Sequence, residues 1–200
     1  MNEQMQHLIV EALEHERGGI GIYSLAVECA QDDGLKEEFG KYLEETRNHE
    51  SALLTVCGEL GIDPELETPA RPIVRETGKA LVSSIEKARE TGNTDVAELV
   101  ACEAVVLAET KDHANWELLS KIASALKGNE RTTLQAAVDE VEDQEDEHLY
   151  HSKGWCRELR LKSLGLRAVL PPPEERKHVK TAIGAARAEQ ARGSMRSSKH

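Results

Sequence analysis

Residues 134–155, LQAAVDEVEDQEDEHLYHSKGW, show most directly how this chain must fold. Positions 134, 138, 141, 145, 148, 152 and 155 recur at helical spacing and define one stripe along a helix. Most of that stripe is apolar, but Glu145 and His148 occupy its middle. A buried carboxylate costs on the order of several kcal/mol unless it is paired or bound to a metal. The stretch therefore predicts a helix that brings a polar or metal-binding group into a protein core.

Three further segments show helical periodicity with the same kind of interruption. Residues 3–30 carry an apolar stripe that is broken at Glu16. Residues 36–59 place His49 on their inward stripe, with Glu45 one turn before it. Residues 95–126 place Glu109 inward and His113 one turn later, and Glu103 is a second inward candidate. These segments predict four helices that each turn ionisable side chains toward one core.

The composition of the whole chain predicts an all-α fold. It is rich in residues that favour helices, and aromatic residues make up only 3% of its 200 residues. A short turn at residues 31–34 joins the first two helices, and a second at residues 127–130 joins the last two. Residues 61–94 form a long crossover with an amphipathic short helix near residues 73–89. Two hairpins joined by one crossover predict a four-helix bundle.

Hairpin geometry places the inward polar residues at one height. In an antiparallel pair, residues equally distant from the turn lie level with one another. Glu16 and His49 are equally distant from the first turn, and Glu109 and His148 are equally distant from the second. The expected buried cluster is Glu16, Glu45, His49, Glu109, Glu145 and His148. Carboxylates with one imidazole per cation suit two iron ions, or manganese, with a bridging carboxylate between them.

These motifs resemble the ferritin-like superfamily, which includes rubrerythrins, bacterioferritins and a group of small stress-associated proteins. The resemblance spans residues 3–160. Its most specific part is the E-x-x-H motif that begins at Glu145; the seven-residue intervals from Glu16 to Tyr23 and from Glu109 to Trp116 also match. Residues 43–49, LEETRNH, look like the second-helix segment of the stress-associated group. The usual Glu three residues before the second-helix His is replaced by Thr46, so Glu45 would have to serve.

The resemblance implies a di-iron protein that oxidises Fe(II) with O2 or hydrogen peroxide, as a ferroxidase or peroxidase in iron handling or oxidative-stress protection. Glu103, His113, Glu142, Tyr23 and Tyr42 are expected as additional ligands or as groups beside the ligands. The four cysteines form no C-x-x-C motif, so no rubredoxin-type site is expected. Repeated turnover would then need an external electron donor. A homodimer or larger oligomer is expected.

The charge is divided unevenly along the chain. Residues 157–200 hold 11 Lys and Arg against 4 Asp and Glu, a net +7, so the total of −12 leaves −19 for residues 1–156. We expect a helical domain over residues 1–162 and a Pro-interrupted basic tail over residues 163–200, partly helical or disordered. Such an acidic body disfavours nucleic-acid binding except through the tail. Without an apolar leader or membrane span, the cytoplasm is the expected location.

Three other functions are compatible with the same residues. A metal-free helical stress protein could act through protein interactions, with its core carboxylates paired by hydrogen bonds. A di-iron oxygenase would act on an organic substrate and would need an apolar channel to the cluster. An iron-storage protein would need a hollow assembly, which the sequence does not encode.

Overall fold

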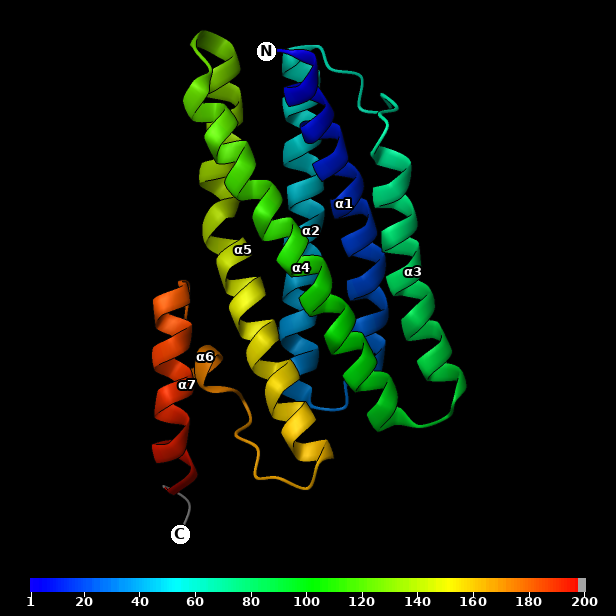
Figure 1. The fold of residues 1–200 in the computed structure, drawn as a ribbon, viewed down its shortest axis with the longest axis vertical. Helices are drawn as coiled ribbons and strands as arrows, with labels where there is room; N and C mark the ends of the chain where they lie inside the picture. The colour runs from blue at the N-terminus through cyan, green and yellow to red at the C-terminus, as the bar shows by residue number, and fades with distance from the viewer. Residues whose placement is uncertain (198–200) are drawn as a thin grey trace.

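The computed structural model describes residues 1–197, and over that range the chain forms seven helices and no strand (Figure 1). The predicted all-α class is confirmed. The helices are α1 (Glu3–Cys29), α2 (Asp33–Leu60), α3 (Arg71–Glu90), α4 (Thr94–Ala125), α5 (Gly128–Ser163), α6 (Pro173–Arg176) and α7 (Ala182–Ser197). None of the helices in the described range is both long enough and apolar enough to cross a bilayer.

Local sequence signals set the helix ends. The side chains of Asn2, Asp32 and Asn93 each accept a hydrogen bond from a backbone N–H in the first turn of α1, α2 and α4. Gly61 ends α2 in the left-handed conformation, with φ of 67°, which glycine adopts without strain. Because so few residues separate α1 from α2 and α4 from α5, each pair forms an antiparallel hairpin.

The long helices contact one another in a closed order. Helix α1 packs on α2 and α4, and α5 packs on α4 and α2. Helix α3, which fulfils the prediction of a helix in the crossover, lies outside this group against α1 and α4 (Figure 1). Its approach to α1 is close because both sides are glycine: a Cβ added to Gly78 would lie 3.3 Å from the Cα of Gly18.

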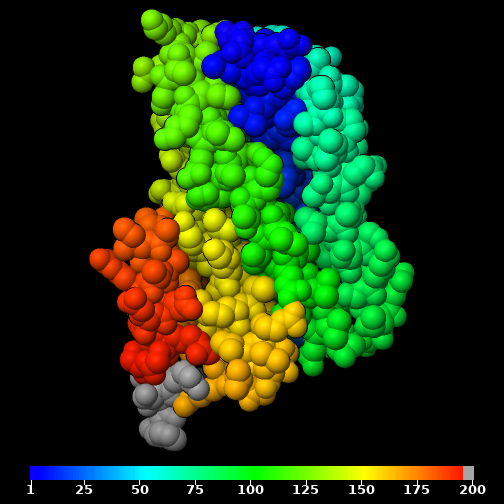
Figure 2. Space-filling view, viewed as in Figure 1, coloured from blue at the N-terminus to red at the C-terminus, as the bar shows by residue number. Residues whose placement is uncertain are grey.

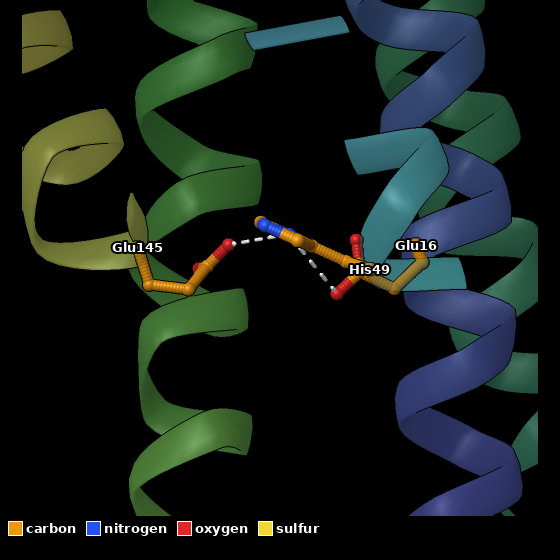
Figure 3. A group of neighbouring side chains, drawn as sticks. All are labelled: Glu16, His49 and Glu145. Carbon is orange, nitrogen blue, oxygen red and sulfur yellow. Dashed lines mark ion pairs between the residues drawn. The ribbon is translucent and has the colours of Figure 1, made fainter. Parts of the chain in front are cut away.

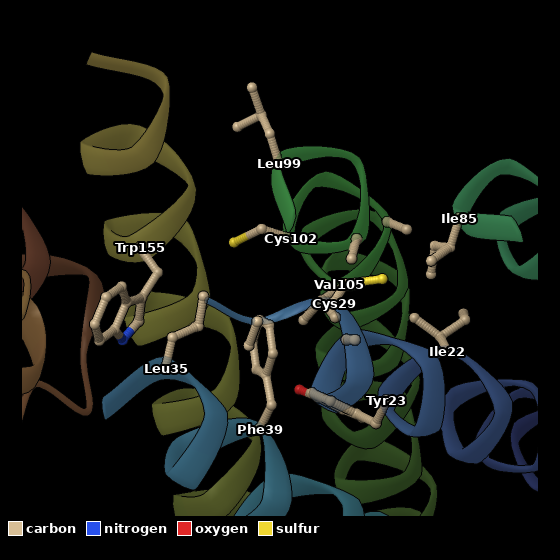
Figure 4. Close-up of a cluster of buried hydrophobic side chains, with 14 of the residues drawn as sticks. Ile22, Tyr23, Cys29, Leu35, Phe39, Ile85, Leu99, Cys102, Val105 and Trp155 are labelled. Carbon is tan, nitrogen blue, oxygen red and sulfur yellow. The ribbon is translucent and has the colours of Figure 1, made fainter. Parts of the chain in front are cut away.

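The apolar core has two parts. One cluster contains Tyr23, Phe39, Val105 and Trp155 and joins α1, α2, α4 and α5, with Ile85 of α3 at its side (Figure 4). The other lies toward the opposite ends of the same helices and includes Leu13, Leu53, Trp116 and Leu134. On α1, α2, α4 and α5, the buried polar residues near the middle of each helix lie between residues of one cluster and residues of the other. Apolar packing therefore closes both ends of the polar layer.

The C-terminal segment folds back onto α5 (Figure 2). The fully buried carboxylate of Glu158 on α5 accepts hydrogen bonds from Arg192 on α7, at 2.5 and 3.0 Å, and from the backbone N–H of Val169. Arg157 binds both carboxylate oxygens of Glu174 at 2.7 and 2.8 Å. The expectation of a partly helical tail is confirmed for residues 182–197, and residues 198–200 lie outside the described range.

Arg192→Ala is expected to release α7 from α5. The change removes two charge-assisted hydrogen bonds from a buried carboxylate, at a cost of about 1.5–3 kcal/mol for such bonds. We expect faster amide hydrogen exchange across residues 182–197, with the exchange of α1–α5 unchanged. Lys180→Ala is the matched control, because its pair with Asp143 is solvent-exposed. Equal exchange in both variants would show that the ion pair does not hold α7.

Candidate metal centre

Five of the six residues expected in the central cluster lie together and are buried. Glu16 comes from α1, His49 from α2, Glu109 from α4, and Glu145 with His148 from α5. None of their side chains is more than 4% exposed. The level placement of Glu16 with His49 and of Glu109 with His148 is confirmed, because each pair is in contact across its hairpin.

The first group of donors is Glu16, His49 and Glu145 (Figure 3). The Nδ1 atom of His49 lies 3.1 Å from Oε1 of Glu145 and 3.8 Å from Oε1 of Glu16. Trp116 donates its indole N–H to Oε1 of Glu16 at 2.8 Å, which holds that carboxylate in place. One ligand atom from each residue lies within 4.8 Å of the others, which is the spacing that a single cation can span.

The second group is Glu109, Glu145 and His148. The Nδ1 atom of His148 lies 3.5 Å from Oε2 of Glu109 and 3.8 Å from Oε1 of Glu145. The imidazole rings of His49 and His148 stack with centroids 5.6 Å apart. Glu145 therefore belongs to both groups, and its Oε1 atom lies near Nδ1 of both imidazoles.

The outer nitrogen of each imidazole has a fixed partner. His49 donates from Nε2 to Oε1 of Gln144 at 2.8 Å, and His148 donates from Nε2 to Oε2 of Glu45 at 2.9 Å. With Nε2 protonated, the Nδ1 of neutral His49 presents a lone pair to the Glu145 oxygen. Metal-binding histidines typically have this arrangement, in which the second ring nitrogen donates to a carboxylate or carbonyl.

Glu45 occupies a different place from the one expected. Its carboxylate lies on the outer side of His148 and outside both donor groups. It also lies 3.8 Å from Lys41 Nζ, and it is 18% exposed. In this structure Glu45 accepts a hydrogen bond from His148 and faces neither donor group, and its role as a ligand stays a prediction. The reason is rotational, since Glu45 lies about 100° around α2 from the inward Thr46.

The cluster concentrates negative charge in a dry interior. Burial raises the pKa of Glu145 well above its ordinary value, and the charges of Asp112, Glu109 and Glu16 raise it further. Burial likewise raises the pKa of Glu16, with Asp112 as the next cause. Burial lowers the pKa of His148, but the hydrogen bonds and charges of Glu109 and Glu45 outweigh it and raise that pKa to about 9.

His49 has the opposite character. Burial lowers its pKa, and the positive charge of His148 lowers it further, to about 4. His49 is therefore neutral at pH 7, with a lone pair on Nδ1. In the metal-free protein, protonated His148 offsets part of the carboxylate charge. A bound divalent cation would displace that proton, because imidazole must be neutral to act as a ligand.

Two residues beside the cluster were not expected from the sequence. Asp112 on α4 is buried, and burial together with the charge of Glu109 raises its pKa to about 6, against a lowering by His15. Gln144 orients His49. Asp112 could have been found by its position, because 109, 112 and 116 recur at helical spacing. Gln144 carries no such signal, because it sits among exposed acidic residues.

Three of the additional candidates lie away from the centre. Glu103 is half-exposed and pairs with Arg160, and Glu142 is exposed. His113 is partly buried and contacts Asp146 at 2.7 Å, outside both donor groups. None of the three belongs to either donor group, and a role for them as additional ligands stays a prediction.

The two tyrosines do lie beside the cluster. The ring of Tyr42 lies 4.1 Å from that of His148, and the ring of Tyr23 lies 6.1 Å from it. The hydroxyl of Tyr42 donates to Glu38, away from the cluster. Both rings therefore contribute to the apolar wall around His148.

The unpartnered atoms decide what the cluster can hold. Within the described residues, Oε2 of Glu16, Oε2 of Glu109, both oxygens of Glu145 and Nδ1 of both histidines are buried and have no hydrogen-bond partner. Buried polar atoms are normally satisfied, so these six atoms around one point are donors that a cation could use. Three carboxylates and two imidazoles form a donor set that fits iron or manganese.

Comparison of the chain with protein families, curated proteins and solved structures gives no match.

Glu145→Gln is expected to stabilise the metal-free protein at pH 8. A carboxyl with a folded pKa above its unfolded value favours the folded state below the unfolded pKa, and that contribution is lost as pH rises through the folded pKa. The glutamine amide does not ionise, so the variant avoids this loss of folding free energy at high pH. Each kcal/mol of added stability raises Tm by about 2–4 °C in a chain of this size. Thermal melts at pH 8 and near pH 5 measure the gain, which should shrink at the lower pH.

The matched control is Glu140→Gln, because Glu140 is an exposed residue of the same helix. Its Tm should not change. Added Mn(II) should stabilise the wild type and the control more than Glu145→Gln. A Tm of Glu145→Gln that equals that of the wild type at pH 8 would contradict the burial of an acidic cluster.

Proposed function

We propose that this chain is a ferritin-like non-haem di-iron protein that binds two Fe(II) ions and oxidises them with O2 or hydrogen peroxide. Helices α1, α2, α4 and α5 would be the four helices of the ferritin-like bundle, and α3 would be its crossover helix. The observation that carries the proposal is Glu145, which belongs to both donor groups and has two unpartnered oxygens.

The donor set favours two cations over one. Glu16 and His49 would hold the first ion, Glu109 and His148 the second, and Glu145 would lie between them. Each ion would then have one imidazole and two carboxylates, a combination typical of iron and manganese sites in helical proteins. Zinc sites more often use three or four nitrogen and sulfur ligands.

The surrounding residues would prepare the site for oxidation. Bound Fe(II) would supply the electrons that reduce O2 or peroxide. The carboxylates of Glu16, Glu109 and Glu145 would neutralise the charge of the oxidised iron, and Gln144 and Glu45 would keep both imidazoles oriented. The apolar clusters on both sides would limit water. An external donor would be needed to return the iron to Fe(II).

The metal-free alternative explains less. A polar core network that replaces a metal is expected to satisfy its own members. Here a proton on Glu145 would satisfy only its 3.1 Å contact with Nδ1 of His49 and would leave the buried oxygens of Glu16 and Glu109 without partners. Two acceptors in that position repel each other unless a proton or cation lies between them. The four free cysteines suit a reducing compartment such as the cytoplasm.

Anaerobic Fe(II) titration followed by oxidant tests the proposal. We expect two Fe(II) bound per chain and, after O2 or peroxide, near-ultraviolet absorption from ferric iron. His148→Ala should lose this absorption and remain helical by circular dichroism, because it deletes a donor of one group. Wild-type protein that binds no iron, or the His148→Ala variant with two irons and full absorption, would contradict the assignment.

Glu45→Gln is expected to weaken iron binding without abolishing it. Loss of the partner of a metal-bound histidine typically lowers affinity about 10- to 100-fold. The variant should still reach two Fe(II) per chain at high iron, because Glu45 lies outside both donor groups. Glu44→Gln is the matched control, because Glu44 is an exposed neighbour of Glu45. The Glu44→Gln variant should bind iron as the wild type does. A Glu45→Gln variant that binds only one iron at saturation would show that Glu45 is itself a ligand.

A further inference from the structure

A polar cavity, separate from the central cluster, lies between α2, α5 and the C-terminal segment. Its volume is about 570 Å³. Its charged and imidazole lining includes Glu37, Glu38, Lys41, Glu147, His151 and Glu175. The four carboxylates outnumber the single lysine, so the cavity is attractive to cations.

His151 supplies an unused nitrogen to this cavity. Its side chain is 2% exposed, and its Nδ1 donates to Oε1 of Glu38 at 2.8 Å. Glu38 also accepts hydrogen bonds from the hydroxyl of Tyr42 and from the indole N–H of Trp155, so its position is fixed. The Nε2 atom of His151 is buried and has no hydrogen-bond partner. A carboxylate on one ring nitrogen and a free lone pair on the other is the arrangement of a metal-binding histidine.

The C-terminal segment adds a carboxylate to the same cavity. Glu175, on α6, lines the cavity together with Glu38; burial and the neighbouring Glu38 raise the pKa of Glu175 to about 8, and its Oε2 atom is buried without a partner. Two carboxyl groups this close need a proton or a cation to offset their repulsion. Arg157 on α5 holds the neighbouring Glu174 and so fixes α6 at the mouth of the cavity.

We propose that this cavity captures a divalent transition-metal cation, Fe(II) or Mn(II), before the cation passes to the central cluster. His151 Nε2 and the Glu175 carboxylate are its protein ligands. Among residues 1–197, only the two central groups bring three possible metal ligands within 4.8 Å of one another, so the cavity has fewer protein ligands than that. Water must therefore complete the coordination in the cavity, so binding there is weaker than at the centre, as transfer requires. This inference rests on the proposed function.

Charged side chains connect the cavity with the centre. Lys41 pairs with Glu147 in the cavity wall and lies 3.8 Å from Oε1 of Glu45. The other oxygen of Glu45 holds His148 at 2.9 Å. Glu147 and Glu45 thus offer successive carboxylates between the cavity and the second donor group. Both are only partly buried, which leaves them room to move.

The loading rate of Mn(II) tests this capture role. The test is stopped-flow mixing of the metal-free full-length protein with Mn(II). We expect His151→Gln and Glu175→Gln to slow loading about tenfold, which is the lower end of the 10- to 100-fold effect usual when a group that supports metal binding is lost. Both should still reach two Mn(II) per chain by electron paramagnetic resonance. Glu189→Gln, an exposed carboxylate of the same C-terminal segment, is the matched control and should load at the wild-type rate. Wild-type rates in both cavity variants would overturn the proposal.

A second measurement separates the cavity from the central site. In Glu145→Gln protein, whose centre lacks its shared carboxylate, substoichiometric Mn(II) should still broaden the ring resonances of His151. Adding Glu175→Gln should remove that broadening. If the wild type binds no pair of ions but the broadening persists, the di-iron function fails and the cavity site stands. If the wild type binds two ions and His151 is never broadened, the cavity site fails alone.

Discussion

The structure depends on the need to place positive charge between acceptor atoms that face one another in a dry interior. The Nδ1 atom of His49 and an oxygen of Glu145 are 3.1 Å apart, and neither has a donor. A proton on Glu145, which its raised pKa favours, relieves this one contact by letting the carboxyl donate to His49, but it leaves the unpartnered oxygens of Glu16 and Glu109 unchanged. Two divalent cations would relieve it for all five residues at once. The pKa values shifted in opposite directions, upward for Glu145 and downward for His49, express the same constraint.

The apolar clusters allow this polar layer to persist. Helices that carried only the central residues would have little reason to associate, since ionised groups prefer water. The clusters around Phe39 and Leu53 hold the long helices together on either side of the layer. Trp116, Gln144 and Glu45 then fix the orientation of individual ligands. The fold thus stabilises an arrangement that the central residues alone would oppose, which is expected of a preformed binding site.

The sequence predicted the helices and most of the cluster because both follow from periodicity. Inward stripes and equal distances from each turn were enough to bring Glu16 to His49 and Glu109 to His148. The failures are rotational. Glu103 precedes Glu109 by six residues, which turns it roughly 240° around α4 and onto the surface beside Arg160. The cavity at His151 could not be predicted, because α6 supplies Glu175 from a segment with little periodicity.

The residue at position 46 accounts for the number of ligands at each proposed ion. Thr46 takes the place of the glutamate expected three residues before His49, and its hydroxyl donates to the carbonyl of Tyr42. A Cβ added to Gly19 would lie 3.2 Å from the Thr46 methyl group, so α1 and α2 approach closely beside this residue. With no carboxylate at this position, each proposed ion would have three protein ligands. Sites with three protein ligands keep positions open for water, oxidant or substrate, whereas closed sites serve structure. Thr46 in place of a carboxylate would therefore leave the proposed centre suited to chemistry.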